Sequence, residues 1–125
     1  MGSLLQNGGT SFENGEGSTT GAATTTLITF PALAVASAYG IDALVTGFES
    51  TGPSGYASNL VALVRSTGAA TALVSSTQFD ATSDAGLAAA TFQVTVAGNN
   101  IIVSVTGVGG LTIHWTCMAT IQIAQ

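Results

Sequence analysis

Hydrophobic and polar residues alternate in three segments of the C-terminal third of the chain. In segment 111–123 every second residue is apolar or small, namely Leu111, Ile113, Trp115, Cys117, Ala119, Ile121 and Ile123. A two-residue period is typical of a β-strand with one buried face. Segments 92–96 and 101–105 show the same alternation. Residues 98–100, Gly-Asn-Asn, lie between these two segments and predict a hairpin.

Further strands are predicted from β-branched runs that end at turn residues. These strands are 24–30, 39–49, 57–66, 70–77 and 87–96, with turns at 51–55, 67–68 and 107–110 and a polar loop at 80–86. Alanines in segment 84–90 also allow a helix, which we rate below a strand. Short strands at this spacing indicate an all-β fold. We expect an antiparallel β-sandwich or jelly roll of about eight strands.

The first 23 residues differ in composition from the rest of the chain. They are rich in Gly, Ser, Thr and Asn, and Leu4, Leu5 and Phe12 interrupt the polar run. Such a segment buries too little apolar surface by itself to offset its ordering entropy. We therefore divide the chain into a flexible or extended N-terminal arm, 1–23, and a β-sandwich domain, 24–125. The arm is either a free tail or a strap on a neighbouring protein, anchored by those three side chains.

Two predicted strands are apolar on both faces, at 41–48 and 60–64. In an antiparallel sheet one face usually meets water. A second apolar face therefore indicates contact with another subunit, or else a strand inside a two-layer core. The candidate interface residues are Val61, Leu63, His114 and Met118. The aromatic residues expected in the core are Tyr39, Phe48, Phe92 and Trp115.

Composition narrows the possible functions. Among 125 residues there are one Arg, no Lys and six Asp or Glu, which gives a net charge of −5. Nucleic-acid binding and attraction to anionic membranes need several cations, so we expect neither partner. One Cys excludes an intrachain disulfide and a thiolate zinc site. A charged fraction of 6% with a mean hydropathy of +0.54 indicates an oligomer rather than a lone subunit. The sequence shows no convincing targeting or membrane-spanning segment.

His114 is the only histidine and therefore the first candidate for chemistry. A Ser–His–Asp arrangement is formally possible, but no G-x-S-x-G elbow is present. We favour a hydrogen-bonded surface or interface histidine. A less favoured alternative is a metal held by three copies of His114 on a three-fold axis. Overall, the sequence predicts no catalytic residue, no resident metal and no cofactor.

The acidic residues offer two further candidates. Asp42 lies in an otherwise apolar strand, and Arg65 is the expected partner in a structural ion pair. Asp80 and Asp84 share a loop, which is either a weak Ca²⁺ site or, as we favour, a solvated loop. Tyr56, in a Gly-rich turn, is a possible aromatic platform for sugars if it is exposed.

The C-terminal third of the chain resembles a known family. Its distinctive residues are Val96-Ala97-Gly98-Asn99-Asn100-Ile101-Ile102-Val103-Ser104-Val105-Thr106-Gly107 followed by Thr112-Ile113-His114-Trp115. They resemble the β-sandwich domain of bacteriophage tail-fibre, spike and other virion proteins, and Thr24-Thr25-Thr26-Leu27-Ile28 is similar to its opening strand. The resemblance implies a trimeric, non-enzymatic domain displayed on the particle surface.

We therefore expect a non-enzymatic phage structural protein on the exterior of the virion. The first hypothesis is a homotrimeric capsid decoration or cement protein that binds the major capsid protein or another virion protein through its arm. The alternative is the receptor-binding tip of a tail fibre or spike, which recognises host glycan or protein through loops 51–56 and 80–86. A hydrolase that uses His114 is the third, least favoured hypothesis.

Overall fold

The computed structural model describes residues 9–125, apart from the side chain of Asp80. This part of the chain forms two antiparallel sheets with a short 3-10 helix between two strands. The strands are β1 (Gly9–Thr20), β2 (Thr24–Pro31), β3 (Ala36–Glu49), β4 (Ser54–Thr67), β5 (Thr71–Ser83), β6 (Thr91–Ala97), β7 (Asn100–Thr106) and β8 (Thr112–Ala124), and the helix is η2 (Ala85–Leu87). The antiparallel β-sandwich expected from the sequence is confirmed.

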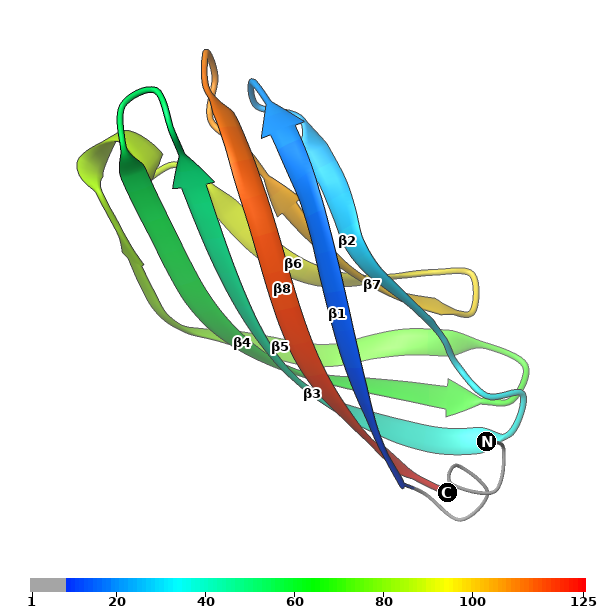
Figure 1. Ribbon diagram of the computed structural model, residues 1–125. Coiled ribbons are helices and arrows are strands. Elements are labelled where there is room, and N and C mark those ends of the chain that lie inside the picture. The colour runs from blue at the N-terminus through cyan, green and yellow to red at the C-terminus, as the bar shows by residue number, and fades with distance from the viewer. Residues whose placement is uncertain (1–8) are drawn as a thin grey trace.

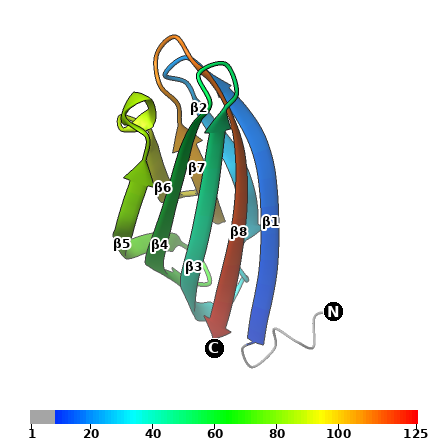
Figure 2. The same cartoon turned by 60° about the vertical axis from the view of Figure 1, so that its left-hand side comes forward.

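The two sheets lie face to face as two layers (Figures 1 and 2). The larger sheet has the strand order β1-β8-β3-β4-β5, and the smaller sheet has the order β2-β7-β6. The first and last strands are neighbours, because Gly9 pairs with Ile123 and Thr20 pairs with Thr112. The predicted hairpin at 98–100 joins β6 to β7, and Ala97 pairs with Asn100.

The core fills the space between the two sheets. The alternation predicted for β8 is confirmed, since its odd-numbered residues from 113 to 123 are buried and most of its even-numbered residues are exposed. The largest fully buried side chains are Trp115, Tyr39, Ile41, Leu87, Ile101, Ile113 and Ile121. The even-numbered residues of β1, β3 and β8 and the odd-numbered residues of β4 form the outer face of the five-stranded sheet.

Residues 9–20 differ from the arm expected at 1–23. They form β1, a full edge strand that pairs with β8 along its whole length. Two features make this possible: β8 offers a long unpaired edge, and β1 turns Gly15 and Gly17 toward the second sheet. A Cβ at Gly15 would collide with the backbone oxygen of Leu27, so only glycine lets β1 lie this close to β2. Leu4 and Leu5 lie outside the described residues.

The segment between β5 and β6 also differs from the expectation. The polar loop predicted at 80–86 begins inside β5, which pairs with β4 as far as Ser83. The strand predicted at 87–96 starts only at Thr91, because Leu87 is buried as part of η2. The backbone N–H of Leu87 donates to the carbonyl oxygen of Asp84 at 3.0 Å, and the backbone N–H of Ala90 donates to the carbonyl oxygen of Leu87 at 3.0 Å. This turn carries Leu87 into the core.

No helix within residues 9–125 has the length and apolar character needed to cross a bilayer.

Candidate functional site

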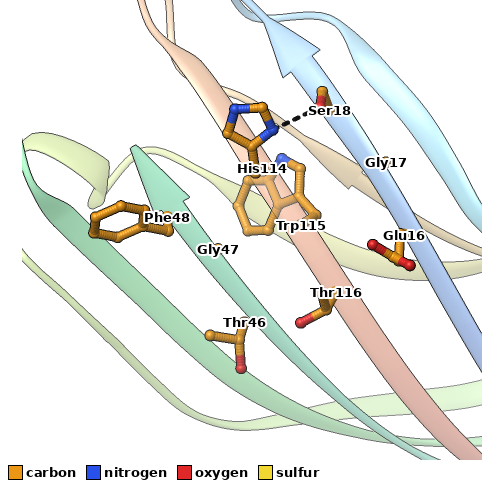
Figure 3. A pocket seen from close by; sticks show the side chains of 9 residues that line it. All are labelled: Glu16, Gly17, Ser18, Thr46, Gly47, Phe48, His114, Trp115 and Thr116. Carbon is orange, nitrogen blue, oxygen red and sulfur yellow. Dashed lines mark hydrogen bonds between the residues drawn. The ribbon is translucent and has the colours of Figure 1, made fainter. Parts of the chain in front are cut away.

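A shallow hollow of about 400 Å³ lies on the outer face of the five-stranded sheet, near one end of β1, β8 and β3 (Figure 3). Its lining residues are Glu16, Gly17, Ser18, Thr46, Gly47, Phe48, His114, Trp115 and Thr116, and we call it the His114 hollow. The strand register aligns these residues in two rows across the sheet. One row is Ser18–His114–Phe48, and the other is Glu16–Thr116–Thr46.

Polar groups and one aromatic ring surround this hollow. The Ser18 Oγ and His114 Nδ1 atoms are 3.0 Å apart and share a hydrogen bond, in which the tautomer of the ring decides the donor. Phe48 stands on the opposite side of His114, and 49% of its surface is exposed. Phe48 was expected in the core. It faces outward because it has the same parity along β3 as the exposed residues Asp42 and Leu44.

The floor of the hollow is the buried ring of Trp115. Gly17 and Gly47 are its register partners on the two neighbouring strands. A Cβ at Gly47 would lie 2.5 Å from the Trp115 ring, so glycine is required there. The indole N–H donates to Thr19 Oγ1 at 2.9 Å. A large aromatic side chain thus lies under the sheet and supports the hollow, and its one polar atom is satisfied.

This set of groups suits a ligand with many hydroxyls. A carboxylate accepts hydrogen bonds, hydroxyls both donate and accept them, and imidazole does either according to its tautomer. An exposed aromatic ring adds an apolar surface on which a flat apolar face can pack. The Ser18–His114 distance also meets the geometric requirement for a nucleophile and its base. The hollow therefore offers both hydrogen-bonding groups and an apolar surface to a polyhydroxylated ligand.

The residues expected at a subunit interface divide into two groups. Val61, Leu63 and Met118 lie on the outer face and are exposed. His114 instead lines the hollow, four residues from Met118 along β8, which is about 13 Å in an extended strand. Phe12, expected as an anchor of the arm, lies on the same outer face with 75% of its surface exposed.

The expected ion pair between Asp42 and Arg65 is not formed. Asp42 is the register partner of Val61, whereas Arg65 is the partner of Ala38, so four residues separate the two charges along the strands. That distance is about 13 Å. Asp42 is exposed and accepts a hydrogen bond from Asn59 Nδ2 at 2.8 Å. Pairing within the sheet, which the sequence does not reveal, decided this outcome.

Sequence reasoning missed the buried acid of the structure, Glu49. Its side chain is 3% exposed, and its two carboxylate oxygens accept the N–H groups of Thr51 at 2.8 Å and Gly52 at 2.7 Å. Glu49 therefore closes the turn between β3 and β4, beside Phe48. The sequence feature that could have revealed this role is the position of Glu49 directly before a turn, where a carboxylate can accept backbone N–H groups.

Two further candidates have structural positions of their own. Tyr56 is buried, and its ring packs edge-on against Trp115 with centroids 5.5 Å apart, so it offers no exposed platform. Asp84 accepts the Gly55 N–H at 2.7 Å, which ties the end of β5 to the start of β4. Among the described residues no group of three or more His, Cys, Asp or Glu side chains gathers to hold a metal.

Comparison with known proteins relates this fold to phage tailspikes. No family model and no curated protein matches the chain. Tailspike protein gp49 of Acinetobacter baumannii bacteriophage Fri1, described as a capsular polysaccharide depolymerase, has a TM-score of 0.55 and 13% sequence identity. The match covers 94% of this chain and 18% of that tailspike.

Two other tailspikes resemble the chain with a TM-score of 0.45. The tailspike of Acinetobacter baumannii phage AM24 is 12% identical, with 91% of this chain and 26% of that protein covered. The tailspike of Acinetobacter phage vB_ApiP_P1 is 15% identical, with 94% and 22% covered. The chain thus spans about a quarter or less of the length of these tailspikes, and the likeness to the Fri1 protein shows a shared β-sandwich fold.

The expectation of a non-enzymatic protein is contradicted by this comparison. The Fri1 tailspike, which contains the same fold, is described as a capsular polysaccharide depolymerase. Residues 96–115 resembled a β-sandwich domain of phage tail-fibre and spike proteins, and the likeness to the Fri1 tailspike supports that fold. The resemblance implied non-enzymatic domains only, and that implication was wrong, because a tailspike with this fold is described as a depolymerase.

Proposed function

We propose that this chain is a glycan-binding β-sandwich of a phage tailspike-type virion protein, which holds host-surface polysaccharide in the His114 hollow. The observation that carries the proposal is the exposed ring of Phe48 beside His114, in a hollow that Ser18 and Glu16 also line. Pyranose rings present a C–H face to aromatic side chains and hydroxyls to polar groups, and this hollow offers both kinds of contact. Capsular polysaccharide is the proposed ligand class because the Fri1 tailspike is described as acting on it.

The test is binding of purified bacterial capsular polysaccharides, measured on an array and then per site by titration calorimetry. Phe48→Ala is expected to weaken binding about tenfold or more, since a tenfold loss corresponds to about 1.4 kcal/mol. Val35→Ala is the control, because Val35 lies in the loop between β2 and β3 and is 48% exposed, but it does not line the hollow. No binding to any polysaccharide, or equal losses in both variants, overturns the proposal.

The same polysaccharides also serve to measure turnover. Reducing ends released by the wild-type chain and lost in His114→Ala would show that chain cleavage requires His114. Binding of polysaccharide without release of reducing ends would mean that the hollow binds glycan and does not cleave it. Either result is compatible with glycan binding, and the assay decides which chemistry the hollow performs.

Attachment to the particle is a separate part of the proposal. The tailspike assignment predicts that antibodies against this chain label phage tails in electron micrographs. Capsid decoration, the first expectation from the sequence, predicts label over the head. The fold likeness to the Fri1 tailspike favours the tail.

We also propose that a second copy of the chain covers an apolar patch on the outer face. The patch consists of exposed side chains on five neighbouring strands: Phe12, Leu44, Val61, Leu63, Phe79 and Met118. Asp42 and Arg65 lie on the same face with Val61 and Leu63 nearby, and they carry opposite charges. A second copy placed in the opposite direction would bring each Arg65 to the other copy's Asp42, which supports self-association over a different partner.

Light scattering tests self-association and counts the copies: the antiparallel arrangement gives two, in place of the three expected from the sequence. The wild-type chain is expected above the 12.3 kDa of a monomer. Val61→Asp is expected to lower the mass, because it places a charge within the patch. Thr95→Asp, which adds the same charge to an exposed site on β6, is expected to change nothing. A wild-type monomer at high concentration contradicts the proposal.

A further inference from the structure

Phe48 has a hollow on each side. The second hollow, of about 430 Å³, shares Thr46, Gly47 and Phe48 with the His114 hollow. Its remaining lining residues come from β4 and from the end of β5: Gly55, Tyr56, Ala57, Thr82, Ser83 and Asp84. We call it the Asp84 hollow. The two hollows are therefore neighbours on the outer face, with the exposed ring of Phe48 between them, and we call the pair the depression.

The depression runs across the strands rather than along them. Ser18, His114, Phe48 and Gly55 are successive register partners on β1, β8, β3 and β4. With neighbouring strands about 4.8 Å apart, this row spans about 14 Å. A single pyranose ring on Phe48 would fill only part of that length, so the depression fits a chain of sugars.

The charges in the depression have one sign. Glu16 lines the first hollow and Asp84 lines the second, and neither lining contains Lys or Arg. Arg65 is the chain's one Lys or Arg, and it lies ten residues from Gly55 along β4, roughly 33 Å away. An anionic sugar would thus meet two carboxylates with little compensation, whereas hydroxyl or ammonium groups would find acceptors.

Asp84 is positioned for this role. Its Oδ2 atom accepts the Gly55 N–H at 2.7 Å, which holds the carboxylate at the mouth of the hollow. The other carboxylate oxygen is the acceptor that a sugar hydroxyl would reach. On the far side, the Ser18–His114 hydrogen bond similarly orients the imidazole.

We infer that the site takes an uncharged or amino-sugar oligosaccharide that crosses the strands over Phe48, from the His114 hollow into the Asp84 hollow. This inference rests on the proposed glycan-binding function. It adds the charge class of the ligand, its direction on the sheet and a second subsite.

The charge class is tested on an array of capsular polysaccharides that contains neutral, amino-sugar and uronate- or sialate-bearing polymers. Binding is expected only among the neutral and amino-sugar polymers. Preferential binding of acidic polymers overturns the inference while leaving glycan binding intact. An array without any binding removes the proposed function itself, so the two failures are distinguishable.

The second subsite is tested with Thr82→Trp, which places a large side chain in the Asp84 hollow from an exposed position on β5. Enzymatic fragments of a bound array polysaccharide, graded from one sugar upward, serve as probes in calorimetry. The variant is expected to weaken the longest fragments at least tenfold and to leave the shortest binding fragment unchanged. Thr95→Trp, on the other sheet, is the control. Equal affinity of Thr82→Trp and wild type for every fragment length would overturn the second subsite.

Discussion

The hydrogen bond between Thr19 and Trp115 gives the sharpest test of the position of β1. Thr19 is 2% exposed, and its Oγ1 accepts the indole N–H at 2.9 Å. Thr19→Val keeps the shape of the side chain and the β-branched preference for a strand, but it removes the acceptor. The buried indole N–H then lacks a partner, which costs about 1–3 kcal/mol.

Urea unfolding measures this loss, and the fluorescence of Trp115, the chain's only tryptophan, serves as the probe. Small domains have m-values of about 1–3 kcal/mol/M in urea, so a loss of about 2 kcal/mol moves the midpoint down by about 1 M. Thr20→Val is the matched control. Its hydroxyl is exposed and lies 3.5 Å from that of Thr112, so the expected change is within about 0.5 kcal/mol.

Equal midpoints for the two variants would refute the reasoning. That result would mean that Thr19 does not lie against Trp115. Residues 9–20 would then be a loosely held arm rather than a strand of the sheet. An unchanged m-value in Thr19→Val is also expected, because the variant removes one hydrogen bond without exposing more surface on unfolding.

Two further predictions concern the same sheet. Gly47→Ala is expected to lower the free energy of unfolding in urea by about 1–3 kcal/mol, because the new Cβ would lie 2.5 Å from the Trp115 ring. Gly40→Ala is the control and should be close to neutral, because a Cβ at Gly40 meets nothing within 4 Å. Burial raises the pKa of the Cys117 thiol from 9.0 to about 11 by penalising the thiolate. The folded protein should therefore resist iodoacetamide at pH 8. Its stability should fall between pH 9.0 and 11, because the unfolded chain releases the thiol proton first, and Cys117→Ala should abolish that part of the pH dependence.

The elements nearest the C-terminus were the most predictable. In β8 the inward and outward faces follow directly from strict alternation, and a Gly-Asn pair between two alternating runs produced the expected hairpin. Both signals are local, because a two-residue period and a tight turn depend on neighbouring residues alone. Segment 9–20 carried no such signal. Its inward positions include two glycines, and its strand conformation comes from pairing with β8 a hundred residues later.

The candidate site was less accessible to sequence reasoning. His114 was singled out, but its partner Ser18 is 96 residues away and belonged to the expected arm. Phe48 was assigned to the core because it is a large aromatic residue in an apolar run. Asp42 and Arg65 were paired because each lacked an obvious local partner. Each of these assignments depended on strand register, and a shift of one residue in register reverses which face a side chain occupies.

The sequence by itself determined that the chain is an all-β protein, where β2, β7 and β8 begin and end, and which residues of β8 face the core. It did so because backbone sterics, turn chemistry and hydrophobic alternation act over a few residues. Only the tertiary structure decided that β1 joins the larger sheet, that the Trp115 ring packs against Gly47, and that Ser18, His114 and Phe48 form one row. Those outcomes depend on hydrogen bonds and close packing between strands far apart in the chain, and local sequence patterns do not predict such contacts.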